Sequence, residues 1–83
     1  MLGWTDDRYR VERVRAHKRV LSGFMTQKAI AAALGVGLET LRGYAKDPAA
    51  GNWRRIPDDK LDRLRDMALE RLEQDLEMYR AAA

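Results

Sequence analysis

The sequence predicts an all-α domain of four to five helices that ends in a long C-terminal helix. No segment alternates apolar and polar residues over more than a few positions, which argues against strands. Apolar residues recur instead at helical spacing, and helix-start and helix-stop residues separate the periodic segments. Eighty-three residues suffice for one hydrophobic core, so residues 1–83 are expected to form a single domain.

The first helix is expected over residues 7–21. Thr5 or Asp6 can cap its start, and Ser22-Gly23 follows its end. At 100° per residue its apolar positions fall on two nearly opposite faces. One face holds Val11, Val14 and Leu21, and the other holds Tyr9, Ala16 and Val20. The helix is therefore buried on both sides, or one side meets a partner.

Two short helices are expected next, at residues 27–34 and from residue 38 to about residue 46. Thr26 suits the N-cap of the first of these, and Gly35 suits the left-handed position after its end. Gly37 precedes the second helix and lacks the side-chain oxygen that Ser, Thr or Asn offers as a cap. Residues 46–56 follow and contain two turn-forming pairs, Asp47-Pro48 and Gly51-Asn52.

The last helix is expected to start at Pro57, since proline is favoured at the first helical position, and to reach about Arg80. Its second half carries an apolar stripe with the 3-4-3 spacing of a helix–helix seam. The stripe consists of Leu69, Leu72, Leu76 and Tyr79. We expect residues 57–83 to form the dimerisation helix. The alternative is that the stripe folds back onto the first helix.

Rare residue types exclude several classes of function. The chain has no Cys, one His (His17) and one Ser (Ser22). Disulfides, zinc ribbons, thiol nucleophiles and a His-ligated metal cluster within one chain are thereby excluded. We expect no enzyme, no catalytic residue, no metal and no cofactor. The longest uncharged run, residues 29–38, is far shorter than the roughly 20 residues of a transmembrane helix, so no membrane partner is expected.

Charge is distributed unevenly along the chain. Residues 1–56 contain 11 Lys/Arg and 5 Asp/Glu, a net charge of +6, whereas residues 57–83 contain 5 and 8, a net charge of −3. A basic body suits a polyanionic partner such as nucleic acid. An ordinary solvated surface would explain the same charge equally well.

Residues 27–46 meet the requirements of a helix-turn-helix, in which two short helices cross steeply through a turn of three or four residues. Ala31 is small where the two helices approach closely, and Gly35 tolerates the positive φ of the turn. Apolar anchors for the core are spaced along both helices: Ile30, Leu34, Val36, Leu41 and Tyr44. The fold is therefore expected to contain a central helix-turn-helix.

With these residues the segment resembles the helix-turn-helix of phage repressor and Cro-type regulators. More loosely, the whole chain resembles the small regulators found with anti-CRISPR genes, through its length, Gln27, the Arg42–Tyr44 spacing and the Arg-containing loop before Pro57. The resemblance implies a homodimeric repressor of its own phage or mobile-element operon. It implies an inverted repeat in double-stranded DNA as the partner, and a location in the bacterial cytoplasm with the nucleoid.

The third helix is the expected reading head. With Leu41 turned toward the core, its outer face holds Glu39, Arg42, Gly43 and Lys46. The major groove admits a helix, where Arg42 can donate two hydrogen bonds to guanine and Glu39 can accept one from cytosine N4. Gly43 would allow the helix to approach the bases closely.

Contacts to phosphate are expected on either side of this helix. Helix N-termini present unpaired N–H groups, so the start of the second helix is one such place. Arg54 and Arg55 form a second candidate clamp, unless they pair with Asp58 or Asp59. Lys18 and Arg19 are expected only to favour the C-terminal dipole of the first helix. The complete set of expected DNA contacts is Thr26, Gln27, Lys28, Gly37, Glu39, Thr40, Arg42, Gly43, Lys46, Arg54 and Arg55.

Two other functions fit the same sequence. An excision or architectural factor of recombination would share the helix-turn-helix and bend DNA. A protein-interaction adaptor would use the acidic last helix as its working surface and would bind DNA without a steep salt dependence.

Overall fold

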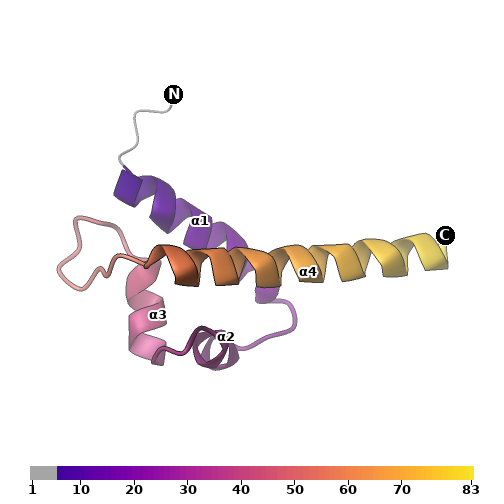
Figure 1. The fold of residues 1–83 in the computed structure, drawn as a ribbon, viewed down its shortest axis with the longest axis horizontal. Coiled ribbons are helices and arrows are strands. Elements are labelled where there is room, and N and C mark those ends of the chain that lie inside the picture. The colour runs from indigo at the N-terminus through magenta and orange to yellow at the C-terminus, as the bar shows by residue number, and fades with distance from the viewer. Residues whose placement is uncertain (1–5) are drawn as a thin grey trace.

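The structure, a computed structural model, describes residues 6–83 and confirms an all-α fold with a long C-terminal helix. Its helices are α1 (Asp6–Leu21), α2 (Gln27–Leu34), α3 (Leu38–Tyr44) and α4 (Asp58–Ala82). Figure 1 shows α1 crossing α4, with α2 and α3 together on one side and the second half of α4 extending beyond the other helices. Thr5, one of the two expected caps of α1, lies outside the described residues.

The hydrophobic core lies where the four helices meet. The predicted inner face of α1 is buried, and α2, α3 and the first half of α4 each present a buried apolar face to it. The core residues are Val11, Val14, Leu21, Ile30, Ala31, Leu34, Leu41, Tyr44, Ile56, Leu61, Leu64 and Ala68. On the opposite face of α1, Tyr9 and Ala16 are exposed, whereas Val20 packs against the core.

Two helix boundaries differ from the prediction. Pro57 is the N-cap of α4 and not its first helical residue, because its ψ of 153° is extended while its carbonyl accepts from Leu61 N at 3.0 Å. α3 ends at Tyr44 and not near Lys46. A tighter turn closes it, in which the N–H groups of Ala45 and Lys46 donate to carbonyls three residues back.

Ion pairs join the start of α1 to the segment before α4. Arg10 pairs with Asp58 and, at 3.1 Å, with Asp6, and its guanidinium also donates to the Ile56 carbonyl. Arg55 pairs with the same Asp6 at 2.8 Å. Hydrogen bonds from Arg10 and Arg55 hold the pKa of Asp6 below its usual value. This network fixes where the loop after α3 returns to the body.

Candidate nucleic-acid interface

The turn between α2 and α3 has the geometry that the sequence predicts. Gly35 adopts a left-handed conformation with φ of 72°, and the Val36 N–H donates to the Ala31 carbonyl at 3.0 Å. This pattern satisfies the last carbonyls of α2 and turns the chain sharply. Gly37 then caps α3 with its backbone alone. Because Gly37 stays exposed, its N–H and Cα remain accessible at the start of α3.

Thr26 is the N-cap of α2, as predicted. Its Oγ1 accepts from the Ala29 N–H at 3.1 Å, while Gln27 and Lys28 follow as the first, exposed residues of the helix. The backbone N–H groups of Gln27 and Lys28, which precede Ala29, have no acceptor within the helix. The three residues expected to contact phosphate therefore lie together at one exposed helix start.

We expect Thr26→Ala to lower the free energy of unfolding by about 1 kcal/mol, because the Ala29 N–H loses its acceptor. Thr26→Ser retains the hydroxyl and serves as the matched control, with most of the stability kept. Urea unfolding followed by circular dichroism measures both. Equal stability of the alanine variant and the wild type would contradict the capping role.

The outer face of α3 carries an acid and a base that pair with each other. Arg42 Nη1 lies 3.0 Å from Glu39 Oε1, and the two side chains are 50% and 86% exposed. Exposed pairs of this kind contribute about 0–1 kcal/mol, so either group can leave the other for a different partner. Thr40 is half-buried on the flank of the helix. The structure thus places Glu39 and Arg42 on the surface, as the reading-head prediction requires.

Gly43 does not face outward, and this part of the prediction is wrong. It is buried under the loop that follows α3, whose Arg54 N–H donates to the Gly43 carbonyl at 3.1 Å. A Cβ at Gly43 would lie 3.1 Å from Arg54 Cγ and 3.2 Å from the Asn52 carbonyl oxygen. The glycine is therefore needed for packing of the loop, and it offers no surface to DNA.

Gly43→Val should lower the free energy of unfolding by about 1–3 kcal/mol, since the added atoms force the loop backbone away from α3. Gly51→Val is the matched control, because a Cβ there meets nothing within 4 Å, and its effect should stay within about 0.5 kcal/mol. Urea unfolding of the two variants distinguishes them. Similar stabilities would show that the contact between α3 and the loop yields without cost.

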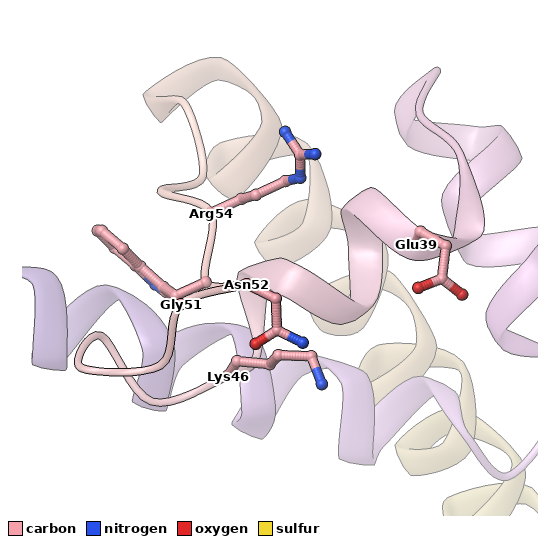
Figure 2. Close-up of a pocket in the computed structure, with 6 residues that line it drawn as sticks. Glu39, Lys46, Gly51, Asn52 and Arg54 are labelled. Atoms are coloured by element: carbon pink, nitrogen blue, oxygen red, sulfur yellow. The ribbon is translucent and has the colours of Figure 1, made fainter.

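Lys46 lies beyond the end of α3 and lines an open hollow with a volume of about 330 Å³. The hollow is lined by Glu39, Lys46, Gly51, Asn52, Trp53 and Arg54. In Figure 2 the Lys46 and Asn52 side chains extend next to each other, whereas the Arg54 guanidinium points away from them. The Trp53 indole N–H is buried and has no hydrogen-bond partner among residues 6–83. Lys46 and Arg54 are thus two cations that line the hollow beside α3.

The side chains of Arg54 and Arg55 point in different directions in the free protein. Arg54 is exposed next to α3, while Arg55 points toward the start of α1 and pairs with Asp6 at 2.8 Å and Asp7 at 3.3 Å. The sequence suggested Asp58 and Asp59 as partners instead. Asp58 pairs with Arg10. Arg54 therefore stays a candidate phosphate contact, whereas Arg55 is paired with acids of α1 in the free protein.

Lys18 is a residue of this surface that the sequence did not indicate. Its Nζ donates to Gln27 Oε1 at 3.2 Å, which links the last turn of α1 to the first residue of α2. Burial lowers the pKa of Lys18, and the nearby positive charge of Arg42 lowers it further. Lys18, Gln27 and Arg42 therefore belong to one surface built from α1, α2 and α3. Neither periodicity nor capping residues could indicate this, because the contact depends on how the turn after α1 places the start of α2.

Within residues 6–83, the apolar stripe on the second half of α4 stays about half exposed or more. Leu69, Leu72 and Leu76 are each 48–49% exposed and Tyr79 is 74% exposed. Counted at 100° per residue, the stripe is rotated by roughly 70° from the buried face formed by Leu61, Leu64 and Ala68. The alternative that the stripe packs onto α1 is therefore wrong.

No protein-family model, curated protein or solved structure matches the chain. The resemblance to phage-type regulators thus stays an expectation. No helix among residues 6–83 combines the length and the apolar character needed to cross a membrane, and these residues contain no group of three or more acids or histidines placed to hold a metal ion.

Proposed function

We propose that this protein is a sequence-specific DNA-binding transcriptional regulator that acts as a homodimeric repressor. One observation carries the proposal: a short helix, α3, follows a capped α2 through a tight turn and presents Arg42 and Glu39 outward on its exposed face. This is the arrangement by which a helix-turn-helix places its second helix in the major groove. The net charge of +6 on residues 1–56 supports a polyanionic partner.

Base recognition follows from the chemistry of the exposed pair on α3. The Arg42 guanidinium matches the O6 and N7 acceptors of guanine, and the Glu39 carboxylate accepts from the amino group of cytosine. A good bidentate contact is worth about 1–3 kcal/mol of discrimination. The exposed Arg42–Glu39 ion pair contributes about 0–1 kcal/mol, so breaking it to make base contacts costs little.

Backbone contacts would fix the register of α3 on the duplex. The start of α2, from Thr26 to Lys28, offers unpaired N–H groups and one lysine. Lys46 and Arg54 offer two further cations from the loop on the other side of α3. Contacts of this kind position a protein and carry no sequence information themselves.

Dimerisation would supply the specificity that one short helix lacks. Two copies related by a two-fold axis read two half-sites spaced by about one helical turn, roughly 34 Å. The uncovered stripe of Leu69, Leu72, Leu76 and Tyr79 supports α4 as the contact between them. A dimer bound to its own promoter would exclude polymerase, which is autorepression of a phage or mobile-element operon.

Selection of duplexes from a pool with 30 randomised base pairs tests this function. We expect an inverted repeat to be enriched, and its affinity to fall with salt at a log–log slope of about −0.9 for each neutralised phosphate. Failure to enrich any motif would contradict sequence-specific binding. Promoter-reporter and excision assays on the enriched site then distinguish a repressor from an excision or architectural factor.

A protein-interaction adaptor is the alternative that one observation favours. The second half of α4 is exposed, apolar along one stripe, and lies within the segment of net charge −3. DNA binding with neither a preferred sequence nor a steep salt dependence would favour the adaptor function.

A further inference from the structure

The hydrogen bond between Lys18 and Gln27 determines which way the Gln27 carboxamide points. Lys18 Nζ lies 3.2 Å from Gln27 Oε1. An ammonium group can only donate, so the carboxamide must turn its carbonyl oxygen toward Lys18. The NH2 group of Gln27 then faces away from Lys18, at the exposed start of α2. A group that presents only donors suits phosphate oxygens, which only accept.

The surroundings of Lys18 favour an additional, anionic partner. Lys18 is half-buried, and among residues 6–83 no carboxylate pairs with it. Burial lowers the pKa of Lys18, and the positive charge of Arg42 lowers it further. Lys18 on α1 and Arg42 on α3 thus repel each other, while Lys18 has only a neutral carboxamide, that of Gln27, as its hydrogen-bond acceptor among residues 6–83. An approaching polyanion relieves the repulsion between them.

We propose that Lys18 is a positioning residue of the DNA interface, which orients the Gln27 carboxamide so that its NH2 group donates to a backbone phosphate. The proposal rests on the proposed function, because it specifies how the start of α2 contacts DNA. In the free protein Lys18 limits the carboxamide to one of two orientations. The conformational entropy of the Gln27 side chain is then lost when the protein folds and not when it binds DNA.

The first test uses the free protein and needs no DNA. In ¹⁵N–¹H spectra the side-chain NH2 signal of Gln27 is identified by its loss in Gln27→Ala. We expect this signal to move in Lys18→Met, which keeps the hydrocarbon stem and removes the donor, and to stay near its wild-type position in Lys18→Arg. An unmoved Gln27 signal in Lys18→Met would overturn the proposal. Thermal unfolding checks that all variants are folded.

The second test is a double-mutant cycle on the tightest duplex from the randomised pool. We expect Lys18→Met to weaken binding by about fivefold and Gln27→Ala by about tenfold. The double variant should bind like Gln27→Ala alone, since Lys18 acts through Gln27. If the two effects on affinity multiply in the double variant, Lys18 binds phosphate by itself. If Lys18→Met binds as tightly as the wild type, Lys18 does not contribute to DNA binding. Either result overturns the proposal.

These outcomes are separable from failure of the proposed function. If the wild-type protein enriches no duplex, sequence-specific binding fails, whereas the spectra of the free protein still test the Lys18–Gln27 contact. If the wild type binds and Arg42→Ala loses specificity while Lys18→Met does not weaken binding, only the role of Lys18 fails.

Discussion

Arg42→Ala should remove most of the sequence selectivity of this protein without unfolding it. Arg42 is half-exposed, and within the described part of the chain its side chain hydrogen-bonds only to Glu39, on the same helix. Losing a bidentate guanine contact costs about 1–3 kcal/mol, and a dimer loses two, which is about thirtyfold in affinity at the least. Fluorescence anisotropy with the selected duplex and a scrambled duplex of equal length measures the change.

The matched control for this variant is Arg63→Ala, which removes the same charge from an exposed position on α4. Its affinity for the selected duplex should stay within about twofold of the wild type, as for a charge outside the contact surface. If Arg42→Ala still prefers the selected duplex as strongly as the wild type does, α3 is not the reading head. An equal loss on both duplexes would instead make Arg42 a phosphate contact.

Leu72→Asp combined with Leu76→Asp should convert the protein to a monomer and weaken operator binding by at least about 100-fold. Both leucines are 48% exposed in the single chain, so the fold loses little when they change. In a dimer the same positions would lie in the seam, where a buried and unpaired carboxylate costs several kcal/mol. A single reading head then binds in the weak range of non-specific complexes. Sedimentation equilibrium and anisotropy measure the two effects.

Gln74→Asp is the matched control for the dimer prediction. Gln74 is exposed on the same helix, on the side opposite the stripe when counted at 100° per residue. This variant should keep the wild-type mass and the wild-type affinity. The stripe has no role in assembly if the wild type is itself monomeric, or if the double aspartate variant sediments and binds as the wild type does.

Elements fixed by neighbouring residues could be predicted from the sequence. Thr26 caps α2 and Gly35 ends it in the left-handed conformation, because both effects depend on hydrogen bonds within a few residues. The buried face of α1 followed from helical spacing alone. The predicted C-terminal end of α3 and the predicted start of α4 were less accurate. The chain tightens after Tyr44, where the loop returns to α3, and Pro57 is extended.

Features that depend on distant segments could not be predicted in the same way. A helical wheel placed Gly43 outward because it has no information on the loop, whose Arg54 lies 3.1 Å from a Cβ built there. Arg55 finds Asp6, 49 residues away in the chain, and not the nearer acids of α4. Lys18 joins the candidate interface only because the turn after α1 brings Gln27, at the start of α2, within hydrogen-bond distance of it.

The most direct test of the central claim, that α2 and α3 bind DNA, is a titration of ¹⁵N-labelled protein with the selected duplex. We predict the largest changes in backbone signals at residues 26–28 and 38–42, with further changes at Lys18 and Arg54. The scrambled duplex should cause smaller changes at the same residues. Changes confined to α4, or no changes with either duplex, would contradict the claim.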